Sequence, residues 1–335
     1  MYDIITFGSA SRDIFLRSKK FREIDNKGFI AGKGLCLPAG SKIRIDDIHF
    51  SPGGGGANTA VTFVNQGFKT AFCGMIGDDP AGNDIVKELK GKKINTEFVF
   101  RTKAKATNQS VVLSFSPKER TILVYRGAAG ELSEKDIPWS KLKSKWFYLA
   151  PLSDKMVKLF EKLIDFAKRN KIKVALNPGN AQLALPKEQL KRILRKVDIL
   201  ILNKEEASLL TGIPYQKEKE IFQQTDLLCP GITIMTKGSE GAVVSDGKYL
   251  YRAPSLRPKA VEGTGAGDSF ASGFLSGFIQ KKGNIEYAIQ LAMANSAACL
   301  QSIGAQNGLL KKTDSWKKTK VEKETCSKNG LCFEK

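Results

Sequence analysis

The pattern of apolar and polar positions predicts an α/β protein. Ile4 to Phe7 form a first apolar run typical of a strand, and residues 11–50 alternate in short strand-like stretches without a helical period. From Ala57 the pattern changes to a helix of small residues ending at Gln66, followed by a strand over 70–76 and a helix over 82–92. A β-α-β order has therefore begun.

Strands and helices alternate regularly in the second half of the chain. The predicted strands cover 146–150, 173–177, 199–202 and 232–236, and the predicted helices cover 155–170, 204–210, 265–281 and 284–302. The helix over 155–170 places on one face Met156, Leu159, Phe160, Leu163, Ile164 and Ala167. Such a stripe packs on a sheet, so the order predicts a largely parallel central sheet covered by helices.

Two strand-rich pieces interrupt this body, at about 12–50 and 98–127. The second contains strand-like stretches over 110–115 and 121–125 around a turn. We expect the two pieces to form a small β-sheet lid over the carboxyl ends of the main strands, where open α/β sheets bind ligands. Ordinary edge strands are the alternative interpretation. Residues 1–310 are expected to form one domain and 311–335 a basic, flexible tail.

Composition and charge narrow the function classes. The 335 residues are 41% hydrophobic, which is typical of a folded chain, and 54 Lys and Arg against 34 Asp and Glu give a formal charge of +20. The lysines are spread along the chain and form no nucleic-acid reading module, so we expect no nucleic-acid partner. We expect no signal peptide, because the chain does not open with a basic segment followed by a long apolar stretch and a cleavage site, and no membrane span, because no apolar run reaches about 18 residues. The cysteines form no CxxC motif, which favours a reducing, cytoplasmic location.

Several common chemistries are excluded by what the sequence lacks. His49 is the only histidine, so a multi-histidine metal site is impossible and a histidine-dependent hydrolase would depend on that residue alone. There is no GxxxxGK[ST] motif, which excludes a P-loop. The turn after the first strand, Gly8 to Asp13, lacks the GxGxxG spacing of dinucleotide-binding folds.

Two glycine clusters point to phosphate chemistry. The first, Gly53 to Gly56, opens a helix and is followed by Asn58, so backbone amides and one side-chain amide can approach a ligand. The second, Gly263 to Gly267, precedes Asp268 and an apolar helix. Unpaired amides and the helix dipole at such a start bind phosphate. Asp268 can take a proton from an attacking hydroxyl, or can simply complement the helix dipole.

Together the two clusters make the chain similar to the ribokinase-like (PfkB) carbohydrate kinases. The run Gly54 to Ala60, with Gly67 and Gly77, resembles the first signature of that family, and Gly265 to Asp268 resembles the second. The resemblance covers about residues 1–310 and implies a three-layer α/β sandwich with a lid. It also implies an ATP-dependent and Mg²⁺-dependent phosphotransferase acting on a primary hydroxyl of a sugar or sugar acid.

The resemblance implies roles for single residues. Asp268 is the implied general base, and the amides of Gly265, Ala266 and Gly267 are the implied anion hole. The acceptor hydroxyls are expected to meet Asp13, Gly54, Gly55 and Asn58. Glu206 of the Asn-x-x-Glu element is expected to place Mg²⁺ through water. The residues implied to contact the nucleotide are Asn203, Thr236, Lys237, Gly238, Gly241 and Asn295.

Departures from the family pattern limit these expectations. Glu262-Gly263 stands where the family usually has Asp-Thr, which leaves a monovalent cation open, and Ser11 and Gly55 replace residues typical of ribose kinases. A nucleoside kinase of the same family remains an alternative, and a sugar-binding regulator without catalysis is a weaker one. Pairing of exposed lid edges would produce a homodimer.

Overall fold

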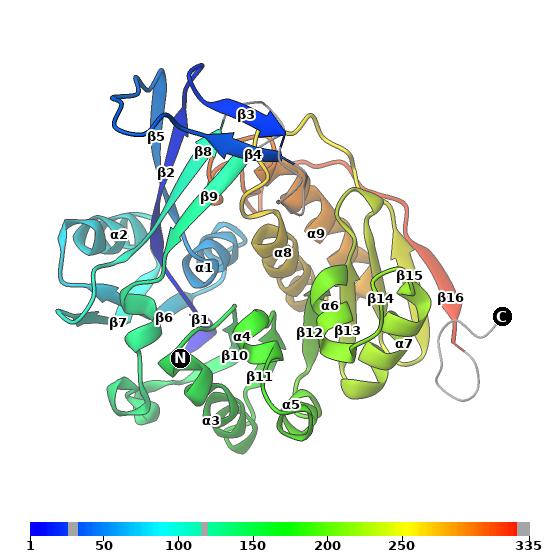
Figure 1. The fold of residues 1–335 in the computed structure, drawn as a ribbon. Coiled ribbons are helices and arrows are strands. Elements are labelled where there is room, and N and C mark those ends of the chain that lie inside the picture. Colours follow the sequence, from blue (N-terminus) through cyan, green and yellow to red (C-terminus); the bar gives the residue numbers. More distant parts are fainter. Residues whose placement is uncertain (26–32, 115–119, 327–335) are drawn as a thin grey trace.

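The fold is built on one ten-stranded sheet, which we describe from a computed structural model covering residues 1–25, 33–114 and 120–326 (Figure 1). Its strand order is β16-β15-β14-β13-β12-β11-β10-β1-β6-β7. The strands from β7 to β13 run parallel and β14, β15 and β16 are antiparallel additions at one edge. The parallel strands are β1 (Tyr2–Phe7), β6 (Thr70–Gly77), β7 (Asn95–Thr102), β10 (Ser144–Leu149), β11 (Lys173–Leu176), β12 (Ile199–Asn203) and β13 (Ile232–Thr236).

Helices cover both faces of this sheet because neighbouring residues of each strand point to opposite sides. Ile4 belongs to a buried apolar cluster with residues of α1 (Gly55–Asn65), α8 (Ala266–Gln280) and α9 (Ile285–Cys299), whereas Ile5 belongs to a second cluster with residues of α3 (Lys155–Arg169), α5 (Lys187–Leu194) and α7 (Glu218–Leu228). Helix α2 (Pro80–Gly91) packs beside α1 on the first face. The second face also carries the short helices α4 (Asn180–Leu183) and α6 (Lys204–Thr211). The predicted three-layer sandwich is confirmed.

A separate four-stranded sheet forms the expected lid. Its order is β5-β2-β8-β9, with β2 and β8 parallel and the outer pairs antiparallel. These strands are β2 (Ser11–Arg17), β5 (Asp47–Gly53), β8 (Asn108–Ser114) and β9 (Arg120–Tyr125). The range 98–127 was too wide, because residues up to Thr102 belong to β7 of the main sheet. Figure 1 shows the lid rising beyond one end of the central sheet.

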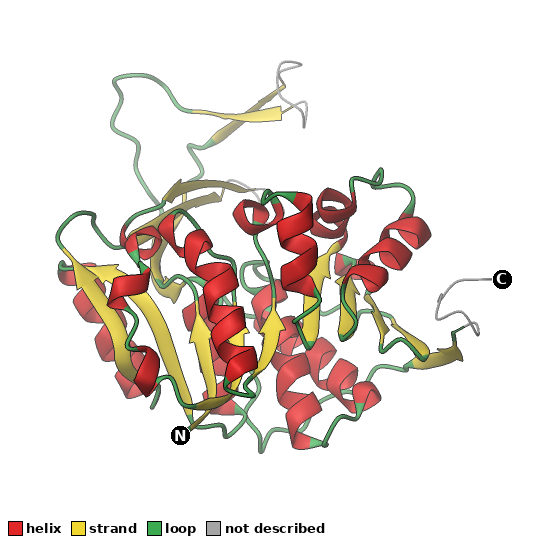
Figure 2. Cartoon of the chain, turned by 90° about the horizontal axis from the view of Figure 1, so that it is seen from below, coloured by secondary structure: helices red, strands yellow, loops and turns green. Residues whose placement is uncertain are grey.

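The remaining strands lie at the periphery. A two-stranded hairpin, β3 (Arg22–Asp25) with β4 (Lys33–Cys36), projects from the body, as Figure 2 shows. At the other edge, β14 (Ala242–Ser245), β15 (Tyr249–Ala253) and β16 (Glu322–Thr325) extend the main sheet. The expectation of a loosely attached tail is wrong for the described part: Tyr251 of β15 pairs with Lys323 of β16, and the Lys323 ammonium lies 3.8 Å from the ring centroid of Tyr249. Residues 327–335 of the predicted tail lie outside the described residues.

Two further observations bear on location. Among the described residues, no helix combines the length and apolar character needed to cross a membrane. Cys73, Cys229 and Cys299 are buried free thiols and Cys36 is an exposed one, whereas Cys326 is disulfide-bonded. The reducing environment expected from the sequence therefore agrees with the four free thiols and not with Cys326. The cytoplasmic location remains a prediction.

Candidate active site

The second glycine cluster forms the N-terminus of α8. Gly265 caps the helix with φ 82°, a left-handed conformation that glycine adopts without strain. A Cβ at this position would lie 2.4 Å from the Cβ of Ala305, so the close packing also requires glycine. The first amides of a helix have no partner within it. The amides of Ala266 and Gly267 therefore carry the positive end of the α8 dipole into the space before the helix.

Asp268 lies in the first turn of the same helix. Its Oδ2 accepts a hydrogen bond of 2.8 Å from the side-chain amide of Asn58. Burial raises the pKa of Asp268, the hydrogen bond from Asn58 lowers it, and the charge of Asp13 raises it, with a net increase. A carboxylate with a raised pKa is a stronger base than an exposed one, which suits proton abstraction near neutral pH.

Asn58 and the first glycine cluster approach Asp268 from α1. Gly54 has φ 93°, and a Cβ there would lie 2.5 Å from the Ser9 carbonyl oxygen, so only glycine lets the chain pass this close. At Gly55 a Cβ would lie 3.4 Å from Oδ1 of Asp268. The absent side chain leaves that oxygen accessible, while Asn58 occupies the other one.

Asp13 reaches the same space from lid strand β2. Its side chain is 5% exposed and accepts a hydrogen bond of 3.0 Å from the Ser11 hydroxyl. Burial raises the pKa of Asp13, hydrogen bonds from Ser11 and Ser110 lower it, and the charge of Glu262 raises it, for a net increase. A buried carboxylate among hydroxyls is equipped to accept hydrogen bonds from a ligand.

These groups line a cavity of about 680 Å³ between lid and body. It contains all the acceptor residues expected from the sequence, together with Gly265 and Asp268. Sequence reasoning missed several further polar lining residues, namely Ser9, Asn108, Gln109, Ser110, Arg126, Ser153, Asp154 and Asn180. Most of them follow a main strand or lie on β8, and only the strand order brings them together.

A second cavity, of about 240 Å³, lies beside Asp268 and contains Asn203 and Glu206. The Asn203 side chain accepts from the amide of Glu206 at 2.8 Å, and the Glu206 carboxylate accepts from the amide of Asn203 at 2.9 Å. This capping box starts α6 and fixes both side chains. Burial raises the pKa of Glu206, its hydrogen bond from Asn203 lowers it, and the charges of Glu205 and Asp268 raise it, for a net increase.

The third cavity, of about 430 Å³, lies on the other side of Gly267. Thr236, Gly238 and Gly241 line it, as expected. Most of the lining residues missed from the sequence are apolar: Ser255, Arg257, Pro258, Ala260, Phe270, Met293, Ser296, Ala297 and Leu300. Phe270 lies on α8, and Met293 and Ala297 lie on α9, where the helical pattern also fits simple core packing.

Asn203 lines the second cavity, whereas two expected nucleotide residues, Lys237 and Asn295, line none of the three. Lys237 donates to the Glu218 carboxylate at 2.8 Å, so its ammonium is directed toward α7. Asn295 is fully buried, and its amide donates to the Ser269 carbonyl at 2.7 Å and accepts from the Leu310 amide at 2.9 Å. Asn295 therefore joins α9 to α8 and to the segment after α9.

All three cavities meet at the start of α8. Gly265 and Asp268 line the first and the second, while Thr236 and Gly267 line the second and the third. Residues after β1, β10, β11, β12 and β13 contribute to them, so the cleft follows the carboxyl ends of the parallel strands. One cleft can therefore hold a polar ligand, a group of phosphates and an apolar ring in sequence.

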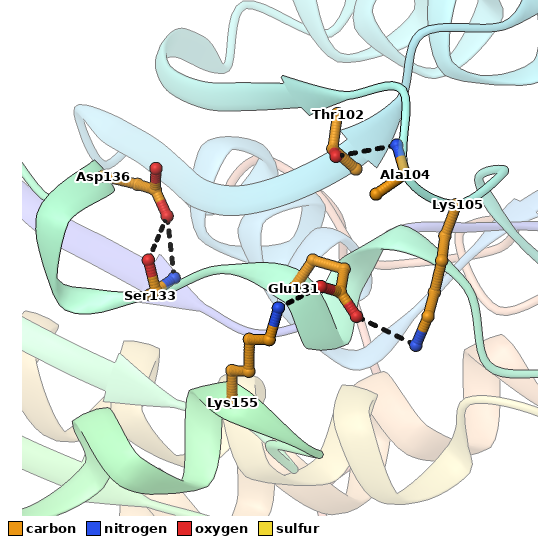
Figure 3. A network of polar contacts seen from close by, with 7 residues as sticks. All are labelled: Thr102, Ala104, Lys105, Glu131, Ser133, Asp136 and Lys155. Atoms are coloured by element: carbon orange, nitrogen blue, oxygen red, sulfur yellow. Dashed lines mark hydrogen bonds and ion pairs between the residues drawn. The ribbon is translucent and has the colours of Figure 1, made fainter.

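The base of the lid is fastened beside this cleft by Glu131 (Figure 3). Glu131 follows β9 and forms ion pairs with Lys105, at 2.9 Å, and with Lys155 of α3. Lys105 precedes β8, so both ends of the β8–β9 hairpin meet α3 at this carboxylate. The hydrogen bonds from Lys155 and Lys105 lower the pKa of Glu131 to about 2. The carboxylate is thus charged throughout the physiological range.

Comparison with known proteins agrees with this geometry. Residues 1–312 match the pfkB family of carbohydrate kinases. The chain is 26% identical over 309 residues to a ribokinase of Staphylococcus aureus, covering 90% of this chain and 95% of that one. It is 30% identical over 291 residues to a probable fructokinase-5 of Arabidopsis thaliana, with 80% and 87% covered.

Solved structures share the fold. An Arabidopsis thaliana ribokinase complexed with ribose and ATP superposes with a TM-score of 0.75 at 22% identity, covering 93% of this chain and 96% of that one. A nucleoside kinase of Methanocaldococcus jannaschii superposes with a TM-score of 0.73 at 22% identity, covering 92% and 95%. The same architecture therefore occurs in proteins named for different acceptors.

Proposed function

Because the chain belongs to the PfkB family of carbohydrate kinases, we propose that it transfers the γ-phosphate of ATP to a primary hydroxyl of a sugar or sugar acid, with Asp268 as general base. The observation that carries this proposal is the meeting of three cavities at the N-terminus of α8. The polar cavity corresponds to the acceptor, the helix amides to the phosphates, and the apolar cavity to the nucleotide base.

The acceptor is assigned to the 680 Å³ cavity. Asp13 and Asn58 supply hydrogen-bonding side chains there, and Gly54 and Gly55 leave room for a ring to approach the backbone. Sugars carry several hydroxyls, and a buried polar group without a partner is unfavourable by roughly 1–3 kcal/mol, so a polar lining selects a hydroxyl-rich ligand. Ribose is not favoured over other sugars, because Ser11 and Gly55 depart from the ribose-kinase pattern.

In the reaction, Oδ1 of Asp268 takes the proton of the acceptor hydroxyl as that oxygen attacks the γ-phosphorus. The bond from the γ-phosphorus to the bridging oxygen breaks, and ADP leaves with its electron pair. The amides of Gly265, Ala266 and Gly267 stabilise the negative charge on the transferred group through hydrogen bonds and the helix dipole. Asn58 holds the second oxygen of Asp268 and so keeps the carboxylate oriented.

The residues present fit Mg²⁺ held through water. Within the described part of the chain no cluster of three or more His, Cys, Asp or Glu is suited to a metal. Mg²⁺ needs no such cluster, because in kinases it binds mainly phosphates and waters with one or two carboxylates. Glu206 is the carboxylate that lines the cavity beside Asp268. When bound, the ion would neutralise phosphate charge.

The nucleotide base is assigned to the 430 Å³ cavity, with Thr236, Gly238 and Gly241 around it. Asn203 lies on the phosphate side. Lys237 and Asn295 are omitted from the proposed contacts, since their polar atoms are engaged with Glu218 and with Ser269 and Leu310. Glu262, where the family usually has Asp, accepts hydrogen bonds from both the amide and the hydroxyl of Thr264.

A nucleoside kinase is the second candidate. Tyr125 and Val124 of β9 line the acceptor cavity, and an aromatic ring beside a ligand site can stack on a nucleobase.

The lid also supports the expected homodimer, because Ile48 and Phe50 of β5 and Leu123 of β9 are exposed on its outer strands. The nucleoside kinase and the homodimer both remain predictions, the second to be checked by light scattering.

The test is an ADP-release assay with Mg-ATP and a panel of acceptors: fructose, ribose, 2-keto-3-deoxygluconate, fructose 6-phosphate and adenosine. Asp268→Asn is run beside the natural protein, with Asp84→Asn on the exposed side of α2 as the control. We expect activity with one sugar or sugar acid, lost by about 10²–10⁴-fold in Asp268→Asn only. Activity confined to adenosine would support the second candidate. Ligand-induced thermal stabilisation without ADP release would indicate a regulator, and normal turnover by Asp268→Asn would overturn the assigned base.

A further inference from the structure

A line of hydrogen-bonded polar side chains leads away from Asp268 to the C-terminus of α2. The Lys92 ammonium, at the C-terminus of α2, donates to Oε1 of Gln306 at 2.7 Å. Nε2 of Gln306 donates to Oδ1 of Asn58 at 3.1 Å, and Nδ2 of Asn58 donates to Oδ2 of Asp268 at 2.8 Å. Three consecutive hydrogen bonds therefore connect Lys92 with the proposed base.

The first member fixes the direction of every later bond. A lysine ammonium has three donors and no acceptor, so Gln306 must turn its oxygen toward Lys92. Its NH₂ group then faces Asn58, which must turn its own oxygen toward Gln306. The NH₂ group of Asn58 is left for Asp268. Without a donor-only group at the start, both amides could rotate by half a turn and reverse the line.

Burial makes this ordering effective. Gln306 is 6% exposed and Asn58 is 5% exposed, so water has little access to satisfy an amide that points the wrong way. Lys92 is half-buried. Burial lowers the pKa of Lys92 and the charge of Glu88 opposes this effect, with a net decrease. Glu88 is itself paired with Arg12 at 2.9 Å, which keeps its charge beside the lysine.

We propose that Lys92 and Gln306 are positioning residues that orient the Asn58 amide, so that Asp268 always receives a donor on Oδ2 and keeps Oδ1 free for the acceptor hydroxyl. The inference rests on the proposed function in one respect, the role of Asp268 as base. Neither Lys92 nor Gln306 lines any of the three cavities of the cleft. Both act through Asn58.

The consequence for Asp268 is electrostatic. A donor on a carboxylate oxygen favours the ionised form, whereas a reversed Asn58 would present an oxygen there and favour the protonated form. Among the described residues, the other titratable groups that interact with Asp268 are Asp13 on β2, Glu206 on α6, Tyr148 on β10 and Cys299 on α9. None of these is a cation, so the donor from Asn58 is the side-chain contact that favours the charged carboxylate, in addition to the dipole of α8.

The hydrogen bond from Lys92 also holds the loop that carries Gln306. It lies directly against the anion hole, since Ala305 limits the space at Gly265. A thiol hydrogen bond of 3.7 Å from Cys299 to the Ala305 carbonyl holds it on one side, and Lys92 holds Gln306 on the other. The hydrogen bonds from Lys92 to Asp268 therefore connect the position of Asp268 with the packing of Ala305 behind the helix amides.

The experiment titrates Asp268 directly. The protein is labelled with ¹³C at aspartate side-chain carboxyls, and the Asp268 signal is identified by its absence in Asp268→Asn. Lys92→Met removes the donor, and Gln306→Glu places an acceptor-only group opposite Asn58, which reverses the amide. We expect both to raise the Asp268 titration midpoint, Gln306→Glu by about one pH unit or more. Lys92→Arg, which keeps a donor, and Lys87→Met, which removes an exposed charge from the same helix, should leave it unchanged.

Kinetics supply the second readout, using whichever panel acceptor gives the highest rate. Gln306→Glu should lower kcat by about tenfold or more at pH 7 and leave the KM for ATP nearly unchanged. The inference is overturned if the Asp268 titration midpoint is unchanged in both Lys92→Met and Gln306→Glu, or if it rises equally in Lys87→Met. Circular dichroism checks that both variants fold, and if one of them does not, the other decides. Because the titration needs no turnover, an active Asp268→Asn would refute the base assignment separately.

Discussion

Asp13 on lid strand β2 and Asp268 at the start of α8 line the same cavity, so carboxylates from both the lid and the body meet in it. Both side chains have a raised pKa, chiefly because they are withdrawn from water, and the charge of Asp13 adds to the effect at Asp268. Two carboxylates in one site tend to separate in role. Here Asp13 is surrounded by hydroxyls, while Asp268 faces the helix amides.

Replacing Asp13 should change the pH dependence of the reaction. Removing a like charge favours the ionised form of Asp268, so Asp13→Asn is expected to lower the pKa of the base and move the acid limb of kcat against pH to lower pH. The KM for the acceptor should rise as well, because a ligand contact is weakened. Steady-state kinetics from pH 5 to 8 check both effects. An acid limb in the same position as in Asp84→Asn would contradict the coupling.

Asp268, the proposed base, should lower the stability of the protein at neutral pH. The pKa of Asp268 is higher in the folded chain than in the unfolded one. Ionisation therefore favours unfolding, and its destabilising effect grows as pH rises above the unfolded pKa of about 3.9. Asp268→Asn removes this effect and keeps an acceptor for Asn58. We expect a higher Tm than that of the natural protein at pH 7, with the difference shrinking toward pH 4. Thermal unfolding followed by circular dichroism would show an equal or lower Tm at pH 7 if the account is wrong.

Glu206 offers a test of the metal assignment with a neighbour as control. Glu206→Gln keeps an oxygen for the Asn203 amide, so the start of α6 should be preserved. Loss of the charge should raise the Mg²⁺ concentration needed for half-maximal activity by about tenfold. Glu205→Gln, one residue earlier and exposed, should leave it unchanged. A Mg²⁺ titration at constant ATP separates the two, and equal behaviour would remove Glu206 from the site.

Substitutions at two glycines of the proposed anion hole should change the stability of the protein in opposite directions. Gly265→Ala forces a left-handed conformation, unfavourable by about 1–3 kcal/mol, and also brings its Cβ against Ala305. Gly267→Ala meets no atom within 4 Å and should stabilise α8 by about 0.5–1 kcal/mol. Its methyl group nevertheless projects at the junction of two cavities, so the KM for ATP should rise. Chemical denaturation with kinetics checks both. Unchanged kinetics in Gly267→Ala would place the phosphates elsewhere.

Local sequence patterns predicted most of the fold because they report on local physics. The strand at Ile232–Thr236 and the helix from Lys155 were placed correctly, since a buried strand and an amphipathic helix have distinct periods. The helix at Glu218–Leu228 was missed, because its apolar positions are few and interrupted by charges. Strand β16 was missed for a different reason. All four residues of Glu322–Thr325 are exposed, so the pairing with β15 leaves no hydrophobic pattern.

The residues of the candidate site were likewise predictable only in part. Gly265 and Asp268 were predictable because a sharp helix start needs glycine and a polar first turn. Lys92 and Gln306 were not, since their significance comes from contacts across 214 and 248 residues of sequence. Asn295 was expected near the nucleotide because of the family resemblance, but its partners are the Thr62 hydroxyl and backbone groups of Ser269 and Leu310.

The ion pairs of Glu131 should control how well the lid excludes water. Glu131→Gln removes the charge that joins both ends of the β8–β9 hairpin to α3. We expect a few-fold higher KM for the acceptor and a larger share of ATP hydrolysed without transfer, because a loosened lid admits water. Glu134→Gln is the control, since Glu134 also pairs with a lysine of α3, Lys162, but lies outside the hairpin base.

The pH and salt dependence of this effect follow from the same carboxylate. With a folded pKa of about 2, Glu131 is charged at every pH used for assay. Its stabilising contribution is complete above the unfolded value of about 4.3 and is lost as pH falls toward 2, so the difference between Glu131→Gln and the natural protein should be constant from pH 6 to 8. High salt screens exposed pairs and should move the natural protein toward the variant. A futile hydrolysis rate equal in Glu131→Gln, Glu134→Gln and the natural protein would show that the lid is held by backbone contacts alone.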